Sequence, residues 1–255
     1  MPSILNREQK RRGRNGHTLV ELLVVLIILS IITAVAMSSM RAGTDVARTE
    51  KTKQLLQQVN YAIAGNPSLT SGGGRADYGY VGDIGAMPPN LDALVLNPGG
   101  YATWNGPYIS DEFSSGGADV SFKYDAWGQA LSLSGPSVIA NGGGTTITSA
   151  VAPSLDDLLR NAVVVTVMDM AETPPGAVFK DSLRALLIVP NGTGGTTTKT
   201  KLFAGDGLTQ FDSIPIGVHL LRVVYLPNSD TLRRQVPVNP GQTSYATVKL
   251  YRKVW

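Results

Sequence analysis

Glu21 is the one ionisable side chain in a long apolar stretch near the start of the chain. It carries the only formal charge between Leu19 and Met37. As a helix with a rise of about 1.5 Å per residue, this stretch is about 28 Å long, close to the hydrocarbon thickness of a bilayer, about 30 Å. Ionisable groups inside such a span are costly and usually functional. Glu21 is therefore the first candidate functional residue.

The remaining reactive side chains do not form a catalytic set. The two histidines, His17 and His219, are far apart in the sequence, and there is no cysteine. The absence of cysteine excludes a disulfide framework, a thiolate metal site and a cysteine nucleophile. No serine-hydrolase elbow, zinc-protease motif or phosphate loop with lysine is present. We expect a protein that is not an enzyme, with His219 on the face or edge of a strand.

The residues just before Glu21 form a specific pattern. A short basic leader ends at Gly16, and His17-Thr18-Leu19-Val20-Glu21 leads into the apolar run. This pattern resembles the processing site of the type IV pilin superfamily. The resemblance implies that a prepilin peptidase cuts after Gly16 and that Glu21 is the fifth mature residue. The family usually begins with an N-methylated phenylalanine at the position where this chain has His17.

The same resemblance implies a role for Glu21 in assembly. Cleavage after Gly16 would create an α-amine on His17 with a pKa near 8. In the family, the glutamate is thought to meet that amine on a neighbouring subunit. A carboxylate in apolar surroundings needs such a cationic partner. We expect Glu21 to set the register between subunits.

Three other interpretations of the stretch remain open. A signal peptide would have an apolar core such as residues 22–32, followed by a small-residue site such as Ala34-Val35-Ala36. In a signal peptide, however, Glu21 would place a negative charge where a positive segment is expected. An uncleaved membrane anchor and a buried helix of a soluble protein are the other two interpretations.

The charge is unevenly distributed along the chain. The formal charge of +3 includes +4 from the first 16 residues, so residues 17–255 carry 17 basic and 18 acidic side chains. The rest of the chain gives no support to nucleic-acid binding. A basic leader before a first span predicts a cytoplasmic N-terminus and an external remainder.

The pattern changes from uniformly apolar to amphipathic after Met37. The apolar positions with helical spacing are Val46, Leu55, Leu56, Val59, Ala62 and Ile63. Gly65-Asn66-Pro67 supplies a stop. We predict one helix over residues 17–64, about 70 Å long, with a membrane-spanning part at about 19–37. Two helices broken near residues 38–43 are the alternative.

The segment after the helix carries a second resemblance. Residues 68–85 are predicted to be a glycine-rich loop, Asn90 to cap a short helix, and residues 120–135 to form two strands around a turn. This region resembles the major pseudopilin of type II secretion, in which a small antiparallel sheet packs on the long helix. The matching residues are Pro88, Leu91, Leu94, Trp104, Gly106, Pro107, Tyr108, Asp125, Trp127 and Gly128. Ala130 replaces the proline of the family's last turn, and both tryptophans are expected to be core residues.

A calcium loop in that family would fall near residues 134–144. Calcium takes six to eight oxygen ligands, but there is no Asp or Glu between Ser134 and Ser154. A site would need carboxylates from outside the loop, for which the candidates are Asp119, Asp125, Asp156 and Asp157. No other cofactor is expected.

The last hundred residues extend beyond this resemblance. Residues 141–154 have the composition of a linker, and Ser154 is expected to cap one or two helical turns. About seven β-rich runs with intervening turn signals follow, which is typical of a sandwich. Their arrangement resembles a transthyretin-like, immunoglobulin-like domain. The expected organisation is a leader (1–16), a pilin-like domain (17–140), a linker (141–154) and a sandwich (155–255), in an α+β fold.

The resemblances imply a structural subunit of a type II secretion pseudopilus. Its implied partners are further copies in a helical homopolymer, prepilin peptidase, an inner-membrane assembly platform, minor pseudopilins, and membrane lipid before assembly. It would lie in the bacterial inner membrane and later in a periplasmic or surface filament. Two alternatives remain: a pilin of a surface pilus used for adhesion or DNA uptake, and a monomeric envelope protein that binds a ligand through its sandwich.

Overall fold

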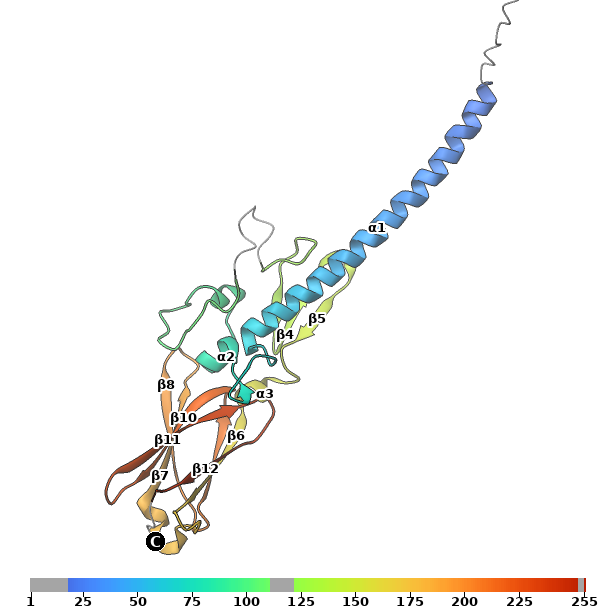
Figure 1. The fold of residues 1–255 in the computed structure, drawn as a ribbon. Coiled ribbons are helices and arrows are strands. Elements are labelled where there is room, and N and C mark those ends of the chain that lie inside the picture. Colours follow the sequence, from blue (N-terminus) through green and yellow to red (C-terminus); the bar gives the residue numbers. More distant parts are fainter. Residues whose placement is uncertain (1–17, 111–121, 252–254) are drawn as a thin grey trace, which may run out of the picture. The chain divides into compact units, whose positions relative to one another are not determined.

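The computed structural model describes residues 18–110, 122–251 and 255. It divides into two compact units, residues 1–47 and 48–255, and each is described by itself. A long helix is followed by many strands, most of them antiparallel (Figure 1). The predicted α+β fold class is confirmed.

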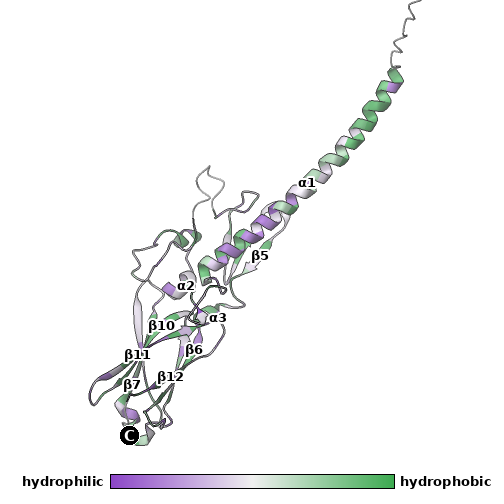
Figure 2. Cartoon of the chain, viewed as in Figure 1, coloured by the Kyte–Doolittle hydropathy of each residue, from purple (hydrophilic) through white to green (hydrophobic). Residues whose placement is uncertain are grey.

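Helix α1 spans Leu19–Ala64 without interruption, as predicted, and the alternative of a break near residues 38–43 is not observed. In the first unit, all described side chains are exposed. The N-terminal part of α1, to about Met37, is almost uniformly hydrophobic (Figure 2). In the second unit, α1 is amphipathic and buries Thr52, Leu56, Val59 and Ile63. Gly65 ends the helix in a left-handed conformation, with φ of 83°.

The glycine-rich stretch after α1 is more ordered than predicted. It contains a small hairpin, β1 (Thr70–Ser71) with β2 (Gly74–Arg75), and a helix, α2 (Gly79–Ile84). The loop prediction for residues 68–85 is therefore wrong. A Cβ on Gly79 would overlap the backbone of α1 at Ala62, so glycine permits close packing here.

The next segment follows the prediction more closely. The side chain of Asn90 accepts a hydrogen bond from the Ala93 N–H and caps a short 3₁₀ helix, η1 (Leu91–Leu94). The Trp104 indole N–H donates to the Ala93 carbonyl at 2.9 Å. Trp104 also packs edge-to-face on Tyr108, with ring centroids 5.7 Å apart. Trp104 is thus a packing residue of this core.

A three-stranded antiparallel sheet completes this region. It consists of β3 (Ser132–Ser134), β4 (Ser137–Ala140) and β5 (Ile147–Ala150). The predicted first strand of residues 120–135 is reduced to a bridge between Tyr124 and Ala130, with residues 120–121 outside the described part. Strand β5 and the 3₁₀ turn η3 (Gly142–Gly144) occupy the stretch predicted as a linker.

Residues 155–249 are all described and form the β-rich part. A capped helix, α3 (Leu155–Leu159), precedes seven strands, and α4 (Gly176–Phe179) and η4 (Lys180–Ser182) lie between the first two of them. The strands are β6 (Asn161–Met168), β7 (Leu183–Pro190), β8 (Thr196–Leu202), β9 (Leu208–Ile214), β10 (Gly217–Tyr225), β11 (Asp230–Val238) and β12 (Ser244–Lys249).

These seven strands form two sheets around one core (Figure 1). One sheet has the order β11-β10-β7-β8 and the other β12-β6-β9, with β12 and β6 parallel. Residues alternate between buried and partly exposed along β6 and β7, as a half-buried strand requires. The number of strands matches the expectation from the sequence.

The sandwich packs directly against the region that precedes it, residues 48–154, to which it is also linked in sequence. Ile216 and Leu158 are buried in the same hydrophobic cluster as Leu56 and Val59 of α1. The Ile216 N–H donates to the Leu158 carbonyl at 2.9 Å. The Tyr78 hydroxyl donates to the Asn239 side chain at 3.1 Å. Residues 48–255 thus share contacts across the stretch predicted as a linker.

Candidate functional site

The first candidate site is the N-terminal part of α1. Glu21 lies in the first turn, where its N–H donates to the Thr18 hydroxyl at 3.3 Å. Gly16 and His17 lie outside the described residues. The large apolar side chains from Leu19 to Met40 are 47–83% exposed. This surface needs either lipid or other apolar helices around it.

Helix α1 has the length and composition to cross a membrane once. The carboxylate of Glu21 lies two residues from the helix start. There it complements the positive end of the helix dipole. At the end of a span, the carboxylate is also less costly than at the bilayer centre. The segment can therefore act as an anchor that carries one accessible charge.

The proposed calcium ligands have other roles in the structure. Asp125 is 4% exposed, and its carboxylate accepts hydrogen bonds from the N–H groups of Trp127 (2.9 Å), Gln129 (2.9 Å) and Gly142 (2.8 Å). Asp157 forms the capping box with Ser154, and Asp156 lies 3.4 Å from Arg160. Asp119 is outside the described residues.

Among the described residues, no group of three or more His, Cys, Asp or Glu side chains could hold a metal. The side-chain oxygens of Asp125 already accept three backbone N–H groups. Within the described part of the chain, Asp125, Asp156 and Asp157 therefore do not form the cluster of convergent oxygens that calcium needs.

The Asp125 contacts explain the second glycine triplet. A Cβ on Gly142 would overlap the Asp125 carboxylate, and one on Gly143 would overlap the Trp127 ring. Residues 142–144 are therefore a turn held against a buried carboxylate. Trp127, expected in the core, is half-buried over this turn.

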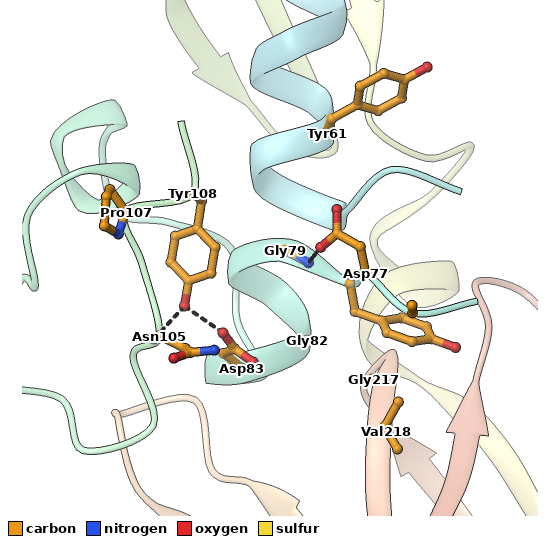
Figure 3. A pocket seen from close by; sticks show the side chains of 12 residues that line it. Tyr61, Asp77, Gly79, Gly82, Asp83, Asn105, Pro107, Tyr108, Gly217 and Val218 are labelled. Atoms are coloured by element: carbon orange, nitrogen blue, oxygen red, sulfur yellow. Dashed lines mark hydrogen bonds between the residues drawn. The ribbon is translucent and has the colours of Figure 1, made fainter. Parts of the chain in front are cut away.

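A polar pocket of about 430 Å³ lies between the end of α1, α2 and the start of β10 (Figure 3). The Tyr108 hydroxyl donates to the Asp83 carboxylate at 2.8 Å and accepts from the Asn105 N–H at 3.0 Å. On the opposite side, Asp77 accepts hydrogen bonds from the N–H groups of Gly79 (3.0 Å) and Asn66 (2.7 Å). None of the residues that line the pocket is basic.

The electrostatics of this pocket follow from burial. Burial raises the pKa of Asp83, the hydrogen bond from Tyr108 lowers it, and the charge of Asp77 raises it further. Burial also raises the pKa of Tyr108, and it raises the pKa of Tyr80 to about 12. At neutral pH, Tyr108 is therefore a donor to a carboxylate and not a base. This pocket was not predicted from the sequence, because residues 68–85 were predicted to be a loop.

His219 is a buried residue of β10. It is 3% exposed, and its Nε2 lies 2.7 Å from the Pro215 carbonyl oxygen. Burial lowers its pKa, and the hydrogen bond to Pro215 raises it by a smaller amount. His219 therefore acts as a neutral donor in the packing of β10.

Comparison with known proteins places the clearest likeness in the N-terminal part. Residues 11–37 match the family model described as the prokaryotic N-terminal methylation motif. This match covers Gly16, His17 and Glu21. The chain is also 26% identical over 134 residues to the type II secretion system core protein G of Xanthomonas campestris pv. campestris. That alignment covers 51% of this chain and 82% of the relative.

Two solved structures were also similar in part. One is the dioxygenase domain of a dioxygenase and carbohydrate-binding fusion from Streptomyces sp. SirexAA-E, with 12% identity, a TM-score of 0.29, and coverage of 38% of this chain and 82% of that one. The other is the Bacillus anthracis TIE protein, with 12% identity, a TM-score of 0.28, and coverage of 47% of this chain and 24% of that one. At these TM-scores neither likeness supports a conclusion on fold or function.

The motif and the curated relative confirm the resemblance that the sequence indicated. The N-terminal segment is that of the type IV pilin superfamily, and the likeness to a type II secretion protein extends beyond it. The relative aligns with about half of this chain.

Proposed function

Because the chain carries the N-terminal segment of the type IV pilin superfamily, we propose that it is a structural subunit of a pilin-like filament, of the type II secretion pseudopilus kind. Prepilin peptidase cuts the precursor after Gly16. The mature subunit leaves the inner membrane at an assembly platform and joins other copies and minor pseudopilins. Its work is mechanical, and it catalyses no reaction.

One observation carries this proposal. The segment that matches the methylation motif, residues 11–37, leads directly into a helix whose apolar side chains are exposed on all sides. A helix that is apolar all round is stable in lipid or among other such helices. Lipid surrounds it before assembly, and copies of the same helix surround it in the filament.

Glu21 then has a specific role in assembly. As the subunit leaves the lipid headgroups, the Glu21 carboxylate enters a bundle of apolar helices. Its pairing with the α-amine of a neighbouring His17 neutralises both charges. This pairing fixes how far each subunit rises relative to the previous one.

N-terminal sequencing of the protein from membranes tests the processing step. A mature protein that starts at His17 supports the proposal. A start at Met37 would indicate a secreted protein cut by signal peptidase after Ala36, and a start at Met1 would indicate a plain anchor. Mass spectrometry of the first peptide also measures whether His17 is N-methylated.

Electron microscopy of sheared cells tests assembly. We expect filaments from the wild type and few or none from Glu21→Val, at equal amounts of processed protein. Glu50→Gln is the matched control, because Glu50 is an exposed helix residue of α1 that pairs locally with Lys53 at 2.8 Å. Equal filament yield from Glu21→Val and the wild type would contradict the pairing mechanism.

A further inference from the structure

The outward face of the four-stranded sheet is unusually apolar for a surface. On β7 and β10, alternate residues such as Leu187 and Leu221 are buried in the sandwich core. The residues between them point away from that core, because successive side chains of a strand alternate in direction. The apolar residues on this outward face of the sheet β11-β10-β7-β8 are Leu186, Ile188, Pro190, Leu202, Val218, Leu220, Val224 and Pro237.

Three arginines lie among these apolar residues. Arg222 on β10 is directly opposite Arg233 on β11. Arg184 on β7 pairs with Val224, two residues along β10 from Arg222. Like charges directly opposite each other on neighbouring strands are destabilising. The outward positions of the four strands, all within described residues, include no Asp or Glu.

Arg222 lacks a full set of acceptors. Its Nε is buried and has no hydrogen-bond partner among the described residues. A buried donor without a partner is costly, and the planar guanidinium best fits a carboxylate, which can accept two parallel hydrogen bonds. Arg184, by contrast, donates to the carbonyls of Asp181 and Leu183 at 2.8 Å. A carboxylate of a partner can supply the missing acceptor for Arg222.

One end of this face is hollowed. A groove of about 460 Å³ lies where Ile188, Val218 and Leu220 meet the segment that contains Thr103 and Trp104. The Thr103 hydroxyl is buried and has no partner among the described residues. The lining is mixed, because Asp83, Asn105 and Thr196 lie beside the aliphatic residues. A groove with such a lining and an unused hydroxyl suits an anchoring side chain of a partner that has both an aliphatic part and a hydrogen-bonding group.

We propose that this arginine face, the outward face of β11-β10-β7-β8 with its groove, docks another protein that presents carboxylates flanked by aliphatic side chains. The carboxylates pair with Arg222 and Arg233, and an anchoring side chain of the partner enters the groove near Trp104. The arginine face lies on the sandwich and is separate from the N-terminal assembly segment, so the proposal does not depend on filament formation.

Charge favours a different protein over a second copy of this chain. On the other sheet, β12-β6-β9, the outward positions include Asp212 but also Lys249. That face has no excess of carboxylates to match three arginines. A nucleic acid would be bound mainly through its phosphates, and eight apolar side chains offer nothing to phosphates.

Site-specific photo-crosslinking in the native cells tests this proposal with the full chain. The probe is p-benzoylphenylalanine in place of Gln235, an exposed residue on the outward side of β11. The matched control has the same probe in place of Thr247 on the opposite sheet. We expect the Gln235 probe to crosslink a segment of another protein that contains at least two Asp or Glu residues.

Charge variants decide whether the arginines carry the contact. Arg222→Gln with Arg233→Gln should reduce the crosslink yield about tenfold, since each charge-assisted pair is lost. Arg160→Gln, a change of an exposed arginine on α3, should leave the yield within about twofold. Arg222→Glu should abolish the crosslink, and a change of one partner carboxylate to Arg should restore it. Cellular levels and thermal midpoints of the variants identify any that fail to fold.

Several results would overturn the proposal. These are a crosslink yield no higher than that of the Thr247 probe, crosslinks to this same chain, or a mapped segment without carboxylates. Binding of the purified protein to phosphatidylglycerol vesicles that is lost in Arg222→Gln with Arg233→Gln would instead identify the arginine face as a lipid-binding surface.

Discussion

The two hydrophobic cores of residues 48–255 are built from different kinds of segments. The pilin-like core packs Leu56, Val59 and Ile63 of α1 against short helices, irregular chain and the small sheet β3-β4-β5. The sandwich core is filled by alternate residues of seven strands, such as Val165 and Leu187. In the pilin-like core individual contacts position the chain, whereas in the sandwich core the regular pairing of strands positions it.

Polar side chains hold the irregular segments of the pilin-like core. Asp125 accepts three backbone N–H groups, Asp77 accepts two, and Asn90 caps η1. Each of these side chains replaces the backbone partners that a strand would supply. Stability of the pilin-like core therefore depends on a few residues, whereas in the sandwich it is spread over many aliphatic contacts.

The largest expected effect comes from crowding one of those anchors. Gly142→Ala would place a methyl group on the Asp125 carboxylate. We expect a loss of about 2–3 kcal/mol in the free energy of unfolding, because the turn must move and a buried carboxylate loses its donor. Urea unfolding of the protein in neutral detergent measures this.

The first glycine triplet supplies the matched control. A Cβ on Gly74 would meet nothing within 4 Å. Gly74→Ala should therefore change the unfolding free energy by less than about 0.5 kcal/mol. Similar losses from both variants would mean that the two triplets are equivalent turns, as their composition indicates.

Short β-rich runs and the turn signals between them made the sandwich predictable from the sequence. Residues 163–167, for example, are almost all valine, and Pro or Gly clusters separate the runs. The helix α1 and the Ser154 cap were predictable for the same reason, since each depends on neighbours a few residues apart. The Asn90 cap was predictable in the same way. The contact between Asp125 and Gly142 was not, because the two residues are far apart in sequence.

The candidate sites divide in the same way. Gly16, His17 and Glu21 form a continuous motif, so one sequence was enough to propose them. The arginine face could be recognised only from the register of the strands, which places Arg222 opposite Arg233. The Asp83 pocket could not be predicted, because it depends on the packing of α2. Helix α2 itself was not predicted, since glycines such as Gly79 and Gly82 are typical of loops.

His219, in the sandwich, should make stability depend on pH. Its pKa is lowered by burial, whereas in the unfolded chain it is about 6.5. Below about pH 6.5 the unfolded state binds more protons than the folded state. The free energy of unfolding that is present above about pH 6.5 is therefore lost as the pH falls toward the pKa of His219 in the folded state. The slope is at most about 1.4 kcal/mol per pH unit for one group. Urea unfolding between pH 7.5 and 5.5 should show this decline, and His219→Gln should flatten it.

The capping box of α3, at the junction between the two cores, makes a smaller contribution to the free energy of unfolding. The Ser154 hydroxyl accepts from the Asp157 N–H at 3.1 Å, and the Asp157 carboxylate accepts from the Ser154 N–H at 3.0 Å. Ser154→Ala should cost about 1 kcal/mol. Ser132→Ala, at an exposed position of β3, is the control. A cost near zero for Ser154→Ala would mean that packing of Leu158 alone holds α3.

The smallest expected effect concerns Asp83 in the polar pocket. Burial raises its pKa, so the folded state holds the proton more tightly than the unfolded state. Its favourable contribution is therefore present below the unfolded pKa, about 4, and is lost as the pH rises through the folded pKa. Asp83→Asn keeps an acceptor for Tyr108 and removes the charge. Thermal unfolding should show a slightly higher midpoint for the variant at pH 7 and no difference near pH 4. A lower midpoint at pH 7 would mean that the ionised pair with Tyr108 outweighs the cost of burying the carboxylate, and the pilin-like core would then gain stability from yet another anchor.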